Sequence, residues 1–140
     1  GLYGAPTKGF KKRDMAKRKE VIEQIQPALV LSIHQNFYPS RAVRGGQVFY
    51  NADNEKSALL GKALQTCLNE LYRTVGVKGR LPKAGEYFML QCTDYPSVIV
   101  ECGFLSNAED EKLLCTDGWK NRLAEQIASG VMGYFSGNFA

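Results

Sequence analysis

The sequence predicts a single α/β domain whose mainly parallel sheet is flanked by helices. Two short segments, 28–33 and 97–100, are apolar on both faces, as strands buried inside a parallel sheet are. Elsewhere apolar residues recur with the period of a helix, and loops containing Gly or Pro separate the segments. Strands that alternate with helices are typical of such sheets, and 140 residues are enough for one domain with one core.

The first half of the chain predicts a basic helix, two strands and a long helix. Residues 14–26 have the spacing of a short amphipathic helix, which Pro27 ends. The buried strand 28–33 follows, and a loop leads to a second short strand at 47–50. The longest helix is predicted at 54–75, because its apolar stripe has the spacing of a helix packed on a core: Leu60, Ala63, Leu64, Cys67, Leu68, Leu71 and Tyr72.

The second half predicts two further strands and two helices. Residues 87–92 are expected to form a strand, and Pro96 introduces the buried strand 97–100. Residues 106–109 have the form of a capping box, which predicts a short helix through 112–115. The last helix is expected to begin at Asp117, with a core-facing stripe of Trp119, Leu123, Ile127, Val131 and Tyr134.

The positive charge is concentrated at the start of the chain. The net charge is +4, and seven cations stand in the first twenty residues against only Asp14 and Glu20: Lys8, Lys11, Lys12, Arg13, Lys17, Arg18 and Lys19. Only one aromatic residue, Phe10, stands among them and no nucleic-acid motif follows, so we expect a solvated helix face or a surface for anionic polymers rather than nucleic-acid binding.

Neither a membrane span nor a cysteine motif is predicted. The longest unbroken apolar stretches, such as 28–31, are far shorter than the roughly 20 residues that a spanning helix needs, and so is 98–100. The four cysteines have no CxxC spacing and stand in apolar surroundings: Cys67, Cys92, Cys102 and Cys115. We interpret them as small core residues rather than as disulfides or metal ligands.

His34 and Glu101 are the candidate functional residues. Each stands at the carboxyl end of an apolar strand, the edge where open α/β sheets bind ligands. A neutral imidazole could bind a divalent metal, and a carboxylate could move a proton between water and a leaving amine. The alternative is a hydrogen-bonded histidine and an ion-paired glutamate. The sequence has one histidine, whereas catalytic zinc normally takes three protein ligands, and Glu86, Asp94 and Cys102 have no spacing that recommends them.

Three segments in order resemble a known family. They are 31–36 (LSIHQN), 46–50 (GQVFY) and 96–107 (PSVIVECGFLSN), and they are similar to the motifs of type 3 N-acetylmuramoyl-L-alanine amidases, most of all the cortex amidases of endospore-forming bacteria. The resemblance implies a zinc hydrolase that cuts the amide between N-acetylmuramic acid and L-alanine in peptidoglycan. It implies that His34 is a zinc ligand and that Glu101 is the general acid/base for a zinc-activated water.

The resemblance also has implications for location and completeness. It implies that the protein acts outside the cytoplasm, in the cell wall or spore cortex. Family members begin with a strand that ends in a GHGG-like motif, followed by a glutamate, and these two ligands are absent from residues 1–140. We therefore expect 1–140 to be a single partial amidase domain, truncated at its N-terminus relative to the family and inactive by itself.

Such a truncation has two further consequences. We expect an exposed sheet edge through which the chain forms a homo-oligomer or a swapped dimer. The alternative function is a non-catalytic module that binds peptidoglycan or a partner protein.

Overall fold

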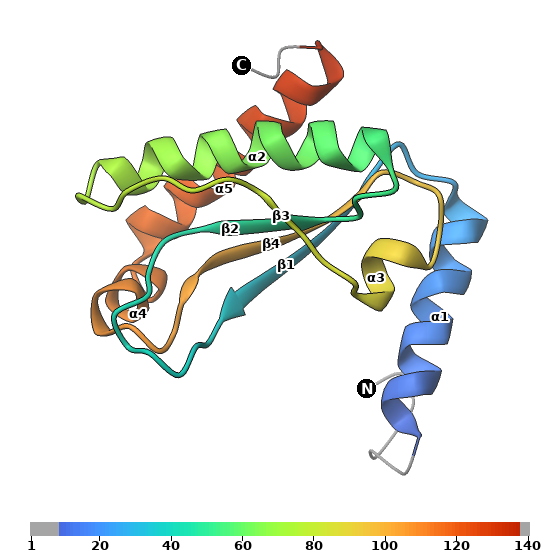
Figure 1. The fold of residues 1–140 in the computed structure, drawn as a ribbon, viewed down its shortest axis with the longest axis horizontal. Helices are drawn as coiled ribbons and strands as arrows, with labels where there is room; N and C mark the ends of the chain where they lie inside the picture. The colour runs from blue at the N-terminus through green and yellow to red at the C-terminus, as the bar shows by residue number, and fades with distance from the viewer. Residues whose placement is uncertain (1–8, 138–140) are drawn as a thin grey trace.

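A computed structural model describes residues 9–137 as a four-stranded sheet with helices on both of its sides (Figure 1). The elements in chain order are α1 (Phe10–Ile25), β1 (Val30–Asn36), β2 (Gln47–Tyr50), α2 (Glu55–Arg73), β3 (Lys83–Ala84), α3 (Phe88–Gln91), β4 (Ser97–Phe104), α4 (Ala108–Leu114) and α5 (Asp117–Phe135). Within this part of the chain, no helix is long and apolar enough to cross a membrane.

The strands lie in the order β1-β4-β2-β3. β1 pairs with β4 in parallel, β2 pairs with β3 in parallel, and β2 pairs with β4 in antiparallel orientation. The predicted α/β class, with a mainly parallel sheet flanked by helices, is therefore confirmed.

The main core lies between the sheet and α2, with α5 packed along α2 (Figure 1). Val98 and Val100 of β4 and Val48 of β2 face this side, where they meet the predicted stripe of α2. The core cluster comprises Val48, Leu60, Leu64, Leu68, Leu71, Tyr72, Val98, Val100, Cys102, Leu114, Trp119 and Leu123. The rings of Tyr72 and Trp119 meet edge to face with centroids 5.2 Å apart, which joins α2 to α5.

The opposite face of the sheet is covered only in part. Phe49 alternates with the core residue Val48 and so faces this side, where its ring contacts Tyr87 just before α3, at 5.4 Å between centroids. α1 lies beside α3 at the end of the molecule (Figure 1) and buries only Ile22. Most of α1 is therefore exposed to solvent.

Two predictions about strands were wrong. Residues 87–92, predicted as a strand, contain the short helix α3. The prediction failed because a short apolar run shows no period that would distinguish a strand from a helix. The segment 28–33 was expected inside the sheet, but β1 is an edge strand and the side chain of Ile33 is 58% exposed. Leu31 and Ile33, on one face of β1, line an apolar groove that is described below.

The remaining differences concern helix ends and cysteines. α1 begins at Phe10 rather than at 14, and α4 begins at Ala108 with Asn107 as its cap rather than Ser106. Among the cysteines expected in the core, Cys102 is buried and Cys115 is exposed, so the interpretation was wrong for Cys115. All four are free thiols.

Candidate active site

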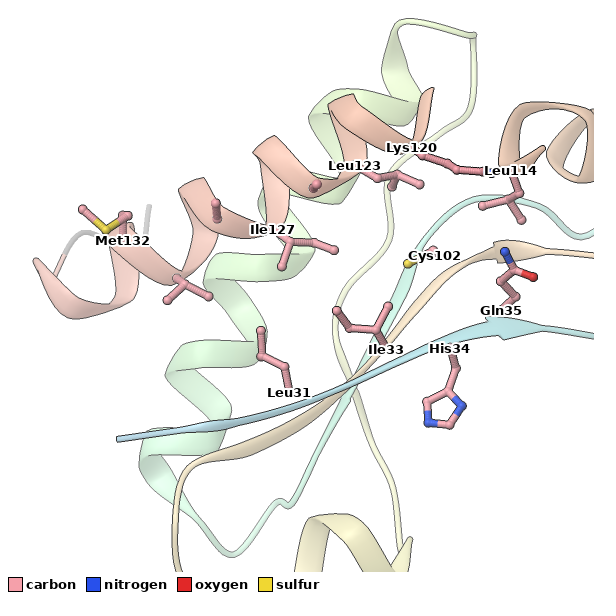
Figure 2. A pocket seen from close by; sticks show the side chains of 13 residues that line it. Leu31, Ile33, His34, Gln35, Cys102, Leu114, Lys120, Leu123, Ile127 and Met132 are labelled. Carbon is pink, nitrogen blue, oxygen red and sulfur yellow. The ribbon is translucent and has the colours of Figure 1, made fainter. Parts of the chain in front are cut away.

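His34 and Glu101 lie directly opposite each other on β1 and β4. The register of the parallel pair places the two residues side by side, on strands that are about 4.8 Å apart. In Figure 2 the ring of His34 points to the side of β1 away from Leu31 and Ile33. Glu101 faces the same side because it alternates with the core residues Val100 and Cys102. The structure thus brings together the two residues that the sequence singled out.

A register shift follows this pair at once. His34 pairs with Glu101, but Asn36 pairs with Phe104, so β4 has one residue more than β1 over the same stretch. Such a bulge bends the strand and interrupts the ladder, and bulges are frequent next to functional sites. The two side chains therefore stand at the last regular pair of the ladder.

The carboxyl group of Glu101 is half-buried and has an unusual environment. Its Oε2 atom is buried and accepts no hydrogen bond from the described residues. Burial raises the pKa of this carboxyl above its ordinary value, and the charge of His34 acts in the opposite direction. A carboxyl group whose pKa is raised by desolvation can hold a proton closer to neutral pH, as a general acid must.

The loop 37–46 is tied to the turn that follows β4. The backbone N–H of Tyr38 donates to Oγ of Ser106 at 2.9 Å, and Nδ2 of Asn107 donates to the carbonyl of Arg41 at 2.9 Å. The Ser-Asn pair of the third motif thus holds the loop that leaves His34. Asn107 also caps α4, since its Oδ1 accepts the N–H groups of Glu109 and Asp110 at 3.0 Å.

Asp110 is the residue that the sequence interpretation missed. It is fully buried, and its Oδ2 accepts the backbone N–H groups of Gly45 at 2.8 Å and of Phe104 at 3.1 Å. Its Oδ1 accepts a hydrogen bond from Nε of Arg44 at 2.9 Å, and Arg44 also contacts Glu109. One carboxylate therefore joins the loop, the end of β4 and the start of α4. The available signal was an Asp three residues after Asn107, the last residue of the third motif segment.

Gly103 lies within β4 and has a packing role. The hydroxyl of Tyr72 donates to the carbonyl of Cys102 at 2.6 Å. A Cβ atom at Gly103 would overlap that hydroxyl and lie 3.2 Å from Leu114. Only glycine leaves room for this hydrogen bond, which fixes the strand just after Glu101.

The described residues fit part of a metal site. No group of three or more His, Cys, Asp or Glu side chains that could hold a metal occurs within residues 9–137. His34 is exposed at the sheet edge and could serve as one ligand. Catalytic zinc needs three protein ligands, so this part of the chain does not form a complete zinc site.

An apolar groove of about 830 Å³ lies on the other side of β1 (Figure 2). Leu31 and Ile33 point across it toward Leu123 and Ile127 of α5. His34 is among the residues that line the groove, but its ring points to the other side of β1 (Figure 2). The groove adjoins the edge of β1 that pairs with no described strand. Within the described strands, the exposed sheet edge expected from the sequence is therefore present.

This chain has clear relatives among known proteins. A family model described as N-acetylmuramoyl-L-alanine amidase matches residues 6–132. The germination-specific N-acetylmuramoyl-L-alanine amidase of Bacillus subtilis (strain 168) is 35% identical over 138 residues, which cover 93% of this chain and 55% of that protein. The chain thus spans about half the length of this relative.

Solved structures agree with the sequence matches. The CwlD amidase from Clostridioides difficile, in complex with the GerS lipoprotein, superposes with a TM-score of 0.87 at 30% identity, over 96% of this chain and 68% of that one. The catalytic domain of CwlV from Bacillus (Paenibacillus) polymyxa var. colistinus superposes with a TM-score of 0.75 at 27% identity, over 87% and 65%. By its sequence and its fold, the chain belongs to the N-acetylmuramoyl-L-alanine amidase family.

Proposed function

We propose that this chain is the part of a peptidoglycan amidase that carries the proton-transfer group, and that the whole domain hydrolyses the amide between N-acetylmuramic acid and L-alanine. The observation that supports this most is the pairing of His34 with Glu101 at the carboxyl end of two parallel strands. The family membership supplies the reaction class, because the relatives carry that activity in their names.

In this proposal Glu101 is the general acid/base. Its half-buried carboxyl group has a raised pKa and an Oε2 atom free of hydrogen bonds from the described residues. It can take a proton from the attacking water and pass it to the leaving nitrogen of L-alanine. The hydrogen bond from the Tyr72 hydroxyl to the Cys102 carbonyl holds the backbone of β4 just after Glu101.

His34 is proposed as one zinc ligand. The other ligands would come from outside residues 9–137 or from another chain, because this region holds no complete set. The incomplete set also favours a second candidate function, a non-catalytic module that binds peptidoglycan or a partner. For either function we propose a place outside the cytoplasm, in the cell wall or spore cortex, because one relative is named a germination-specific amidase and another a cell wall amidase.

A chimera separates the two functions. Residues 9–137 replace the matching part of the Clostridioides difficile amidase, whose chain extends beyond the superposed region. We expect the chimera to release L-alanine amino termini from purified peptidoglycan, and Glu101→Gln to lower the rate by about 10²–10⁴-fold. A folded chimera that releases none would overturn the hydrolytic function, as would full activity in the Glu101→Gln variant.

A further inference from the structure

Arg80 is a half-buried cation that has no counter-ion among the described residues. It lies in the loop between α2 and β3, and no carboxylate within residues 9–137 forms an ion pair with it. Burial lowers the pKa of its guanidinium, while the charge of Asp110 acts in the opposite direction. Removing a cation from water is unfavourable unless an anion or several acceptors replace that water. An anionic ligand would therefore satisfy this side chain.

Asp110 does not serve as the missing counter-ion, because its oxygens are already occupied. Oδ1 accepts a hydrogen bond from Arg44, and Oδ2 accepts the backbone N–H groups of Gly45 and Phe104. Arg80 itself uses one of its five N–H donors, from Nη2 to the carbonyl of Arg44 at 2.7 Å. The other four donors have no acceptor within the described part of the chain.

The loop holds the guanidinium of Arg80 in one place. Asn69 on α2 binds both backbone groups of Arg80, since its Nδ2 donates to the carbonyl at 2.7 Å and its Oδ1 accepts the N–H at 3.2 Å. At the other end of the side chain, Cζ lies over the ring of Phe104, 5.5 Å from its centroid. A binding group that is already held in position loses little conformational freedom when its ligand arrives.

The ring of Phe104 places this guanidinium on the face of the candidate active site. Phe104 follows Glu101 on β4 and pairs with Asn36, which stands two residues after His34 on β1. Alternate residues of a strand share a face, so Phe104 and Asn36 lie on the same side of the sheet as His34. In agreement, Phe104 is buried but does not belong to the core cluster on the other side.

The loop of Arg80 lies on the side of Glu101 that is opposite His34. β4 has β1 on one side and β2 on the other, so His34 and Gln47 flank Glu101. Nε2 of Gln47 donates to the carbonyl of Leu81 at 3.0 Å, which holds the loop against β2. In the proposed reaction the carbonyl of the amide faces the metal ligand and its nitrogen faces the general acid. The leaving peptide then extends toward Arg80, and the sugar extends away from it.

We propose that Arg80 binds the carboxylate of the stem-peptide residue that follows L-alanine, and so favours substrates in which this group is charged. The inference rests on the proposed function, which supplies the stem peptide. An extended peptide advances at most about 3.6 Å per residue, so this carboxylate lies roughly 7 Å from the nitrogen that Glu101 protonates. The two-residue step from His34 to Asn36, the partner of Phe104, is similar, at about 6.6 Å. The free N–H groups of a guanidinium match the two oxygens of a carboxylate.

The first test is the binding of two peptides to the 140-residue chain, followed by NMR chemical shifts. Both peptides contain L-alanine, then D-glutamate joined through its side chain to L-lysine, and they differ only in whether the D-glutamate has an α-carboxylate or an α-carboxamide. We expect the wild type to bind the carboxylate peptide about 10- to 100-fold more tightly, as a hydrogen bond to a charged group allows. Arg80→Gln should bind both peptides with the affinity that the wild type has for the carboxamide.

Arg122 provides the matched control. Its guanidinium lies over the ring of Trp119 at 5.4 Å, as that of Arg80 lies over Phe104, but Trp119 belongs to the core on the other side of the sheet. Arg122→Gln removes the same charge and the same kind of ring contact, and it should leave both affinities unchanged. Arg80→Lys keeps the charge without the planar pair of donors, so it should keep only part of the preference. Unchanged binding of the carboxamide peptide would show that a variant is folded.

The second test measures hydrolysis by the chimera described above. Its substrates are N-acetylmuramoyl peptides that carry the same two alternative groups. We expect Arg80→Gln to raise KM for the carboxylate substrate about 10- to 100-fold and to leave kcat within a few-fold, because the contact is present in both the bound substrate and the transition state. The carboxamide substrate should be hydrolysed equally by the two proteins.

The two tests separate this inference from the proposed function. Equal affinities of the wild-type chain for the two peptides would overturn the inference, and so would no binding of either peptide or a preference that survives in Arg80→Gln. An active chimera that does not distinguish the two substrates would overturn this inference alone. An inactive chimera, together with Arg80-dependent binding by the chain, would overturn only the hydrolytic function.

Discussion

The carboxylate of Asp110 and the guanidinium of Arg44 form an ion pair across 66 residues of chain, with Nε and Oδ1 2.9 Å apart. The side chain of Asp110 is fully buried and that of Arg44 is 18% exposed. This pair and the Gly45 N–H hold the loop 37–46 against the end of β4.

Asp110→Asn should lower the free energy of unfolding by roughly 2–4 kcal/mol, because the substitution leaves a largely buried guanidinium without its full counter-charge. Urea unfolding measures the change. Glu109→Gln is the control, since the Glu109 side chain is 76% exposed and its contact with Arg44 should contribute less than about 1 kcal/mol. An equal loss of unfolding free energy in the two variants would show that Asp110 stabilises the fold no more than the exposed Glu109 does.

A second prediction concerns Gly103 and Tyr72. Gly103→Ala should destabilise the fold by about 1–3 kcal/mol, because the new Cβ displaces the Tyr72 hydroxyl. Adding Tyr72→Phe removes the overlapping oxygen, so the double variant should be more stable than the sum of the single changes predicts. Thermal unfolding measures all three proteins. Strict additivity would show that the overlap is relieved elsewhere.

Gly118→Ala is the matched glycine control for this cycle. Gly118 lies in the first turn of α5, and nothing stands within 4 Å of the Cβ atom that alanine would add. Alanine there should leave the free energy of unfolding unchanged or raise it by up to about 1 kcal/mol, so the melting temperature should not fall.

Thiol labelling at pH 8 should order the cysteines by burial. Cys115 is exposed and should react first, while Cys102 is 7% exposed. Burial, followed by the charge of Glu101, raises the pKa of the Cys102 thiol to about 11, so almost none of it is thiolate at pH 8. Mass spectrometry after iodoacetamide treatment gives the order, and Cys115→Ser should remove the fast phase. Rapid labelling of Cys102 in the folded protein would be inconsistent with this packing.

The zinc content of the purified chain tests the incomplete ligand set. We expect well under one zinc per chain after dialysis, because His34 supplies one of the three ligands that a catalytic zinc needs. His34→Ala should reduce the residual zinc further. Mass spectrometry of metal and intact protein on one sample makes the comparison. One tightly held zinc per chain, at the mass of 140 residues, would mean that another residue or a second chain completes the site.

Self-association is the last prediction and concerns the free edge of β1. We expect light scattering to show mass that rises with concentration, as two copies pair at β1 and cover the groove. Ile33→Lys should shift the chain toward monomer. Ile25→Lys is the control, because Ile25 is similarly exposed, at 67% against 58%, but lies on α1. A monomer at all concentrations would contradict the prediction.

Local pattern predicted much of this fold because the relevant physics is local. The stripe of α2 shows one helical face in the sequence, and Leu60, Leu64 and Leu68 are all buried as expected. The polar residues at two strand ends predicted that His34 and Glu101 would meet, since parallel strands share an edge. The first prediction needs only the spacing of apolar residues along one helix, and the second needs only the fact that parallel strands run in the same direction.

The rest depended on contacts between distant segments. Whether β1 has one neighbour or two is decided by the other strands, so the apolar residues around Ile33 could not distinguish an edge from an interior strand. The run that forms α3 is too short to show a period. Asp110 has its partners 65 and 66 residues away, at Gly45 and Arg44, where no spacing rule applies.

α1 carries Lys11 and Lys12 in its first turn, which has no acidic residue, so the ionic strength of the solution affects the stability of this helix. Added salt screens the repulsion between Lys11, Lys12 and the positive end of their own helix, so the helix should fray less as salt rises. The first turn of α1 should therefore be better ordered at high ionic strength than at low ionic strength.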